Sequence, residues 1–218
     1  MSKKTDNLNA LKHQLKPKTK NQAEYIRAIA ENQITFVSGP AGSGKSKIAT
    51  AMACEYFYYQ KINKIIITRP MVEAGRSIGY LPGSSTEKSL PYMIPIIDEL
   101  NQSFDPVYVQ SLIRTNTIEI LPLAYMRGRN FHNCFVIADE MSNATFTELK
   151  LLLTRIGNNC KMVINGDLKQ SDLPLYDQGA LDDVCKKLVN MPDIAIIRLY
   201  DNDIIRNPLI SQILERLN

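Results

Sequence analysis

One stretch, residues 34–46, constrains this chain more than any other. Its first five residues are mostly apolar and are typical of a buried strand, and a glycine-rich turn and a helical run follow them. Gly39, Gly44, Lys45 and Ser46 fit the spacing G-x-x-x-x-G-K-[ST] of a phosphate-binding P-loop. Because a strand precedes the motif and a helix follows it, we predict a P-loop rather than an ordinary glycine-rich turn.

The residue types of this motif suit the phosphates of a nucleotide. Glycines allow backbone N–H groups to turn inward around phosphate oxygens, and the start of the following helix adds positive charge at the same place. Lys45 is predicted to reach the β- and γ-phosphates of ATP, and the Ser46 hydroxyl to ligate Mg²⁺. The predicted nucleotide-binding residues of this loop are Gly39, Pro40, Ala41, Gly42, Ser43, Gly44, Lys45 and Ser46.

Apolar strands alternate with helical segments along most of the chain. Strands are predicted at 34–38, 64–68, 118–121, 134–138, 161–165 and 194–199. Helices are expected to start at Thr19, to span 44–60 and 146–156 with Gly157 just beyond, and to include Leu209, Ile213 and Leu217. This alternation predicts an α/β domain with a mainly parallel sheet and helices on both faces.

Two segments are expected to differ from this pattern. Residues 71–116 are predicted to be rich in loops, with short helical pieces between Pro91, Pro95 and Pro106. Residues 1–18 are polar and basic and are expected to form a flexible or partly ordered arm before a single domain at 19–218. The aromatic run at 56–59 is interpreted as core and helix packing.

The bulk composition is that of a globular protein, with 218 residues, 44% hydrophobic and 22% charged. The net charge of +4 permits a nucleic-acid partner without requiring one. No apolar run approaches ~18 residues and the start lacks a signal-peptide core, so we expect a cytoplasmic protein with no membrane partner. The four cysteines, without C-x-x-C spacing, are interpreted as reduced buried thiols rather than a metal site.

Acidic residues follow the fourth predicted strand directly. Four apolar residues and then Asp139-Glu140 form the Walker B pattern, and the end of a parallel strand faces the ligand edge of the sheet. Asp139 is predicted to hold Mg²⁺ together with Ser46, and Glu140 to orient and deprotonate the attacking water. An acidic cap on the next helix is the alternative interpretation.

Three further polar groups are candidates for contacts with the nucleotide. Asp167 and Gln170 follow the fifth strand, where they would sense the γ-phosphate or simply form a turn. Gln22 either completes a T-x-x-Q capping box with Thr19 or hydrogen-bonds adenine. An arginine on the γ-phosphate is also expected, and spacing alone does not choose among Arg127, Arg129, Arg155 and Arg206.

Several stretches together resemble the PhoH-like ATPases, relatives of the superfamily 1 helicases. Besides the P-loop they are Arg-Pro-Met-Val-Glu-Ala-Gly at 69–75, Leu-Pro-Gly at 81–83 and Tyr-Met-Arg-Gly-Arg at 125–129. The resemblance continues with Leu-Thr-Arg-Ile-Gly at 153–157, with Gly-Asp-x-x-Gln at 166–170 and with Asp-Leu-Pro at 172–174. It covers about residues 19–215, and the compact form is similar to phage-encoded members, for which the compartment would be the host cytoplasm.

The resemblance implies a RecA-like domain that hydrolyses ATP, assembles as a ring of six chains, and acts on RNA or single-stranded DNA. It implies an adenine contact for Gln22 and a γ-phosphate contact for Asp167 and Gln170. The segment Asp-Ile-Ile-Arg ending at Arg206 matches a family motif, which makes Arg206 the preferred nucleotide-contacting arginine. Arg69, Arg127 and Arg129 are placed near nucleic acid or a subunit interface by the same analogy.

Two departures from the family pattern bear on function. Ser142 stands where the family has the glutamine that couples nucleotide state to nucleic acid, and Asn207 stands where it has histidine. Because Asp139 and Glu140 remain, hydrolysis is expected, with weaker coupling. Two alternatives to a nucleic-acid motor are therefore kept, namely an ATP-controlled switch for a protein partner and a small-molecule kinase.

Overall fold

The computed structural model describes residues 10–12, 15–70, 85–168, 173, 178–205 and 216, and for residues 85–92 it describes the backbone only. Six strands form one sheet in the order β3-β2-β4-β5-β1-β6, and every neighbouring pair is parallel. The strands are β1 Ile34–Ser38, β2 Lys64–Thr68, β3 Ile118–Ile120, β4 Cys134–Ala138, β5 Cys160–Gly166 and β6 Ile194–Arg198.

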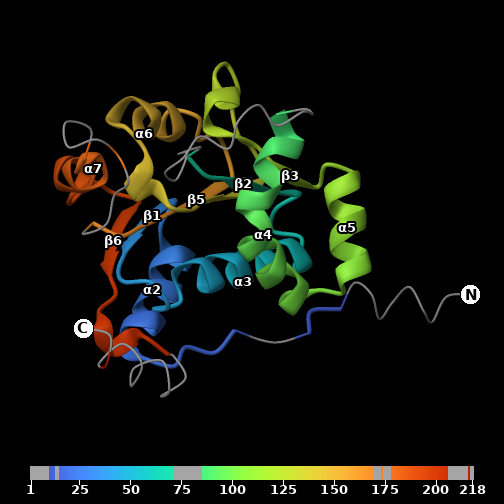
Figure 1. The fold of residues 1–218 in the computed structure, drawn as a ribbon, viewed down its shortest axis with the longest axis horizontal. Coiled ribbons are helices and arrows are strands. Elements are labelled where there is room, and N and C mark those ends of the chain that lie inside the picture. The colour runs from blue at the N-terminus through green and yellow to red at the C-terminus, as the bar shows by residue number, and fades with distance from the viewer. Residues whose placement is uncertain are drawn as a thin grey trace, which may run out of the picture.

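Helices cover both faces of this sheet (Figure 1). They are α2 Lys20–Glu31, α3 Lys45–Tyr58, α4 Ser85–Ser103, α5 Pro106–Arg114, α6 Phe146–Leu153 and α7 Ala180–Leu188. Short 3₁₀ turns follow β3, β4 and β6: η1 Leu123–Met126, η2 Met141–Asn143 and η3 Asp201–Asp203. The predicted α/β class, with a parallel sheet between helical layers, is confirmed.

The core lies in two layers, one on each side of the sheet. One layer packs α2, α3, α4 and α5 against the strands and is centred on side chains such as Tyr25, Met52 and Leu100. The other packs α6, α7, η1 and η2 against the opposite face and includes Phe36 and Leu149. All five residues of β4 are buried, as expected for a central strand covered on both faces.

The prediction for residues 71–116 was wrong in the part that the structure describes. Helix α4 runs without interruption through Pro91 and Pro95, and α5 begins at Pro106, where a proline suits the first turn of a helix. Met93, Ile96 and Leu100 are almost fully buried at helical spacing. Burial of this apolar face outweighs the backbone hydrogen bonds that the two prolines remove.

Gly157 does not end α6 as predicted. The helix ends at Leu153, and Gly157 instead lets two loops approach closely, because a Cβ there would lie 2.5 Å from His132 Cε1 and 2.7 Å from the Phe131 carbonyl oxygen. Its N–H donates to that same carbonyl oxygen at 2.9 Å. The glycine is thus explained by close packing at the edge of the sheet where β4 and β5 begin.

The aromatic run at the end of α3 divides in two. Tyr56 packs edge-on against Phe135 and Phe57 against Phe104, as predicted. Tyr58 and Tyr59 are exposed and contact each other, so the prediction of core packing holds only for the first half of the run.

Part of the basic N-terminal segment lies against the domain. Leu11 and Leu15 pack on the core layer of α2 and α3, and the Lys12 N–H donates to the Ser103 carbonyl at 2.9 Å. The helix expected around Leu209–Leu217 falls almost entirely outside the described residues. None of the helices in the described part of the chain is long and apolar enough to cross a membrane.

Candidate nucleotide-binding site

The loop between β1 and α3 takes the backbone conformation that its glycines allow. Gly42 and Gly44 have φ values of 84° and 95°, a left-handed region that other residues rarely adopt. A Cβ at Gly39 would lie 2.7 Å from the Leu199 carbonyl oxygen, so the loop also needs glycine for close approach to β6. The predicted loop residues therefore lie together at the carboxyl ends of the strands, where open α/β sheets bind ligands.

Lys45 is the first residue of α3, and its side chain turns back along the loop. Its Nζ donates to the carbonyl oxygens of Gly39 and Pro40, the latter at 3.0 Å. Burial lowers the pKa of Lys45 below 10.5, and the nearby carboxylates of Asp167, Glu140 and Asp139 oppose that effect. The ammonium is thus held on the concave side of the loop, among the acidic residues predicted from the ends of two other strands.

Ser46 and Asp139 are in direct contact. The Ser46 hydroxyl donates to Asp139 Oδ1 at 2.7 Å, although the two residues come from α3 and from the end of β4. Asp139 is only 5% exposed, and its N–H donates to the Thr68 carbonyl oxygen of the neighbouring strand at 2.9 Å. These are hard oxygen donors, the type that Mg²⁺ prefers, so the two residues fit a magnesium ion shared with phosphate oxygens.

Two buried residues extend the hydrogen bonding of Asp139, and the sequence did not predict either of them. Asn165, near the end of β5, donates from Nδ2 to Asp139 Oδ1 at 3.1 Å. The Tyr25 hydroxyl donates to Asn165 Oδ1 at 3.1 Å and lies 3.4 Å from the Lys45 carbonyl oxygen. A polar residue in an otherwise apolar strand was the available signal for Asn165, whereas Tyr25 fitted the helical apolar pattern and gave none.

Glu140 lies beside a predicted interface residue. Its backbone has a φ of 54°, in the left-handed region, and its side chain is 47% exposed. The Arg69 guanidinium approaches Glu140 Oε1 at 3.3 Å. The structure thus places Arg69 next to the predicted general base, and its predicted contact with nucleic acid or another subunit stays a prediction.

Gln22 connects α2 to the P-loop. Its side chain is 5% exposed, accepts from the Lys18 N–H at 2.9 Å and donates to the Ser43 carbonyl oxygen at 3.0 Å. The Gln22 N–H also donates to the Thr19 hydroxyl at 3.2 Å, which is one half of the predicted capping box, while the other half goes to Lys18 instead of Thr19. The adenine contact stays a prediction, and it would require the amide to exchange one of these partners.

The end of β5 packs closely on the turn after β4. The Asp167 N–H donates to Ser142 Oγ at 3.4 Å, and Ser142 is buried. A Cβ at Gly166 would lie 2.3 Å from Leu181 Cδ2 on α7 and 3.0 Å from the Ser142 nitrogen, so glycine permits this close packing. Gln170 lies outside the described residues.

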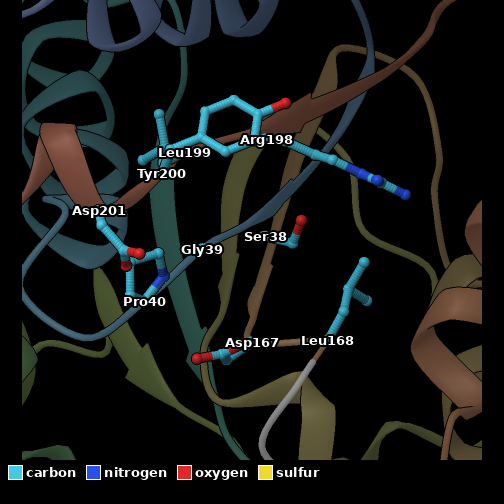
Figure 2. Close-up of a pocket in the computed structure, with 9 residues that line it drawn as sticks. All are labelled: Ser38, Gly39, Pro40, Asp167, Leu168, Arg198, Leu199, Tyr200 and Asp201. Carbon is cyan, nitrogen blue, oxygen red and sulfur yellow. The ribbon is translucent and has the colours of Figure 1, made fainter.

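A cavity of about 360 Å³ borders the P-loop and is lined from the ends of three adjacent strands. Figure 2 shows Asp167 on one side of it and Tyr200 on the other, with Ser38, Gly39 and Pro40 of the loop between them. The remaining lining residues are Leu168, Arg198, Leu199 and Asp201. A cavity beside a phosphate-binding loop is where a ligand is expected to bind.

Comparison with known proteins assigns the family. The family profile described as PhoH-like protein matches residues 14–218. This chain belongs to the PhoH-like family. The PhoH-like protein of Bacillus subtilis is 41% identical over 207 residues, which cover 95% of this chain and 65% of that protein. The PhoH-like protein of Synechocystis is 39% identical over 201 residues, which cover 92% of this chain and 61% of that protein. The chain thus spans less than two thirds of the length of these curated relatives.

Among solved structures, the large terminase of bacteriophage D6E superposes with a TM-score of 0.56 at 10% identity, covering 93% of this chain and 51% of that one. At this identity the likeness concerns the fold alone. It agrees with the RecA-like arrangement of a parallel sheet and a P-loop.

The arginines of the PhoH-like Tyr-Met-Arg-Gly-Arg stretch differ in their surroundings. Arg129 binds Glu119 with both terminal nitrogens, at 2.7 and 2.9 Å, and this hydrogen bonding holds the pKa of Glu119 below its ordinary value. Arg155 donates to the Arg129 carbonyl oxygen at 3.2 Å. Arg127 is exposed, as is Tyr125 two residues before it, which makes Arg127 the stronger candidate for an external partner.

Arg206, the arginine preferred for the nucleotide, lies just outside the described residues. The residues before it are anchored, because the Asp203 carboxylate accepts from the Thr19 hydroxyl and, at 2.8 Å, from Asn21 Nδ2. The segment leading to Arg206 is therefore tied to the start of α2, next to the P-loop.

Proposed function

We propose that this chain binds ATP with Mg²⁺ and hydrolyses it. The observation that carries the proposal is the 2.7 Å contact between Ser46 and Asp139, beside Lys45 in a loop whose glycines adopt left-handed conformations. An acidic cap of the next helix would not explain a carboxylate that is 5% exposed and bonded to the first turn of the P-loop helix. A P-loop with a bonded Walker B carboxylate is the arrangement used for phosphoryl transfer.

The donor set fits a magnesium ion, which Ser46 and Asp139 would hold and which would neutralise charge on the phosphates. In the described part of the chain, no group of three or more His, Cys, Asp and Glu side chains is placed to hold a metal. That agrees with the usual magnesium site of nucleotide hydrolases, in which substrate phosphates and waters supply most ligands.

Each side chain of the site has a separate role in the proposed ATP hydrolysis. Lys45 binds phosphate oxygens, and the loop N–H groups surround them. Glu140 orients the attacking water and accepts its proton, while Arg69 fixes the direction of the Glu140 carboxylate through their ion pair. Gln22 is proposed to contact adenine, Asp167 and Gln170 to sense the γ-phosphate, and Arg206 to stabilise the charge that develops on it.

We further propose that the chain acts in the cytoplasm as a ring of identical subunits, six by family resemblance, on RNA or single-stranded DNA. The support is membership of the PhoH-like family, a net charge of +4, and an exposed tyrosine and an exposed arginine two residues apart at 125 and 127. Single strands bind to basic surfaces that also offer aromatic rings for stacking.

Phosphate release from ATP, measured with and without single-stranded RNA and DNA, tests this function. We expect Mg²⁺-dependent release that rises several-fold with one of the polymers and that Lys45→Ala abolishes. Lys47→Ala is the matched control, because Lys47 lies two residues further along α3 and its side chain contacts Gln102 and Glu99 instead of the loop. Turnover that Lys45→Ala leaves intact would refute the proposed site.

A switch that acts on a protein partner is the second candidate, and Ser142 favours it. The serine that replaces the family's coupling glutamine is 8% exposed and bonded inside the chain to Asp167, so it offers no side chain to an external strand. Turnover that is real but indifferent to both polymers, with one protein retained in stoichiometric amount on the immobilised chain, would establish this alternative.

A further inference from the structure

Asp139 is hydrogen-bonded to Asn165, which is bonded in turn to Tyr25, and neither residue belongs to the nucleotide-binding motifs described above. The Asn165 amide donates to Asp139 Oδ1 at 3.1 Å, and the Tyr25 hydroxyl donates to the amide oxygen of Asn165 at 3.1 Å. Tyr25 and Asn165 are both 0% exposed. The result is a continuous line of hydrogen bonds from α2 through β5 to the carboxylate at the end of β4.

The chemistry of the three groups fixes the direction of every bond in this line. An ionised carboxylate only accepts, so the Asn165 NH₂ group must face Asp139, and its oxygen then faces Tyr25. The reversed amide would bring its oxygen against the carboxylate. A phenol in this place supplies a donor to the amide oxygen, which favours the required orientation.

Tyr25 is well suited to remain that donor. Burial, and then the nearby charge of Asp139, raise the pKa of its hydroxyl well above 10.0, so the proton stays on the phenol at any ordinary pH. Its oxygen also lies 3.4 Å from the carbonyl oxygen of Lys45. The phenol therefore stands between the first turn of the P-loop helix and Asn165, which in turn contacts the acidic residue at the end of β4.

We propose that Tyr25 and Asn165 are positioning residues that hold the Asp139 carboxylate ready for Mg²⁺. With the Ser46 hydroxyl and the Asn165 amide both bonded to Oδ1, the carboxylate has one orientation before the ion arrives. Groups that fix the orientation of a ligand raise metal affinity without touching the metal. The inference rests on the proposed Mg²⁺-dependent nucleotide site and adds α2 to it.

Binding of a fluorescent ATP analogue, titrated with Mg²⁺ and repeated in EDTA, separates positioning from general structure. For Tyr25→Phe we expect the Mg²⁺ concentration at half-saturation to rise roughly two- to tenfold, the effect of one lost hydrogen bond, with affinity in EDTA unchanged. Tyr108→Phe is the matched control, because Tyr108 is a partly buried tyrosine on α5 whose ring packs on Phe104 and not on the nucleotide site. Its Mg²⁺ curve should coincide with that of the wild type.

A second variant tests the line of bonds as a unit. Asn165→Ala should shift the Mg²⁺ curve in the same direction, and adding Tyr25→Phe to it should shift the curve little further, because Tyr25 acts through the Asn165 amide. The affinity in EDTA reports that each variant still forms the P-loop.

Three results would overturn the inference. Coincident Mg²⁺ curves for Tyr25→Phe and wild type would show that the phenol does not position the metal site. An equal loss of affinity with Mg²⁺ and in EDTA would assign Tyr25 a purely structural role. A wild-type chain that binds no nucleotide under either condition would refute the proposed function itself, and the inference with it.

Discussion

Asp139 Oδ1 accepts hydrogen bonds from two side chains on different elements, Ser46 on α3 and Asn165 on β5. A carboxylate with two fixed donors has lost its rotational freedom before any ligand binds, which lowers the entropic cost of binding a metal. At this scale the sequence predicted Asp139 and Ser46 from local motifs. It did not predict Asn165 or Tyr25, because their roles depend on strand register and on the direction in which α2 crosses the sheet.

Lys45 gives a prediction about pH. Burial lowers its pKa from 10.5, against the attraction of Asp167, Glu140 and Asp139. At pH values between the lowered pKa of folded Lys45 and 10.5, the Lys45 amine is more protonated in the unfolded chain than in the folded chain. The contribution of Lys45 to the unfolding free energy therefore rises with pH in this range. We therefore expect Lys45→Met to melt higher than wild type at about pH 7, with the difference shrinking toward about pH 10. Thermal unfolding without nucleotide measures both, and a wild type that melts higher at neutral pH would contradict the argument.

Arg69 gives a prediction about positioning. The Arg69–Glu140 pair is partly exposed, so its removal should change the unfolding free energy by less than about 1 kcal/mol. If the pair directs Glu140, Arg69→Ala should still lower the rate of ATP hydrolysis roughly tenfold, because a misplaced base is inefficient. Lys64→Ala is the control, since Lys64 forms a comparable ion pair with Glu119 on β3. An unchanged or increased rate in Arg69→Ala would contradict the assigned role.

At the scale of elements, α2 connects more of the site than its sequence suggests. Its first residues bind Asp203 of η3, Gln22 reaches the P-loop, and Tyr25 reaches the Asp139 carboxylate, the proposed metal ligand, through Asn165. The apolar periodicity predicted that α2 exists and which face it buries. It could not predict the contacts with Asp203 and Asn165, because these residues lie more than a hundred positions from α2 in the sequence.

The strands were the best-predicted elements, because continuous apolar runs of four or five residues identify buried parallel strands such as β4. Helix α4 was mispredicted, because its prolines are strong local breakers while the burial that stabilises it is a tertiary property. Gly157 was misread for the same reason: its neighbours Phe131 and His132 are distant in sequence.

Gly157 yields a prediction about packing between β4 and β5. A methyl group there would approach His132 Cε1 to 2.5 Å and the Phe131 carbonyl oxygen to 2.7 Å. We expect Gly157→Ala to lower the unfolding free energy by about 1–3 kcal/mol, the usual cost of overpacking. Because the site lies at the opposite ends of these strands, nucleotide affinity of the folded variant should equal that of wild type. Denaturant unfolding and nucleotide titration measure the two effects, and a variant as stable as wild type would contradict the packing argument.

At the scale of the whole molecule, the site is proposed to be completed by a neighbouring subunit. The P-loop and the Walker B residues lie within one chain. The resemblance allows the preferred arginine, Arg206, to act either within that chain or across a boundary in the ring, and we propose the second. Lys45→Ala and Arg206→Ala variants should each be inactive alone, and mixing them should restore part of the activity. Restoration requires that one variant supplies the intact P-loop and the other the intact arginine.

The mixing experiment is paired with a measurement of mass in solution by light scattering. We expect a species of several chains in both variants. A monomeric mass at all concentrations, together with no restored activity on mixing, would contradict the ring.

The central claim is that the ends of β1 and β4 form a nucleotide hydrolysis site in which Glu140 activates water. The measurement that tests it most directly is phosphate release from ATP by Glu140→Gln beside wild type, with ATP affinity measured on the same preparations. The account predicts that Glu140→Gln binds ATP as wild type does but releases phosphate at least roughly a hundredfold more slowly, the usual effect of removing a general base. Equal rates in the two proteins, or no release by wild type, would contradict it.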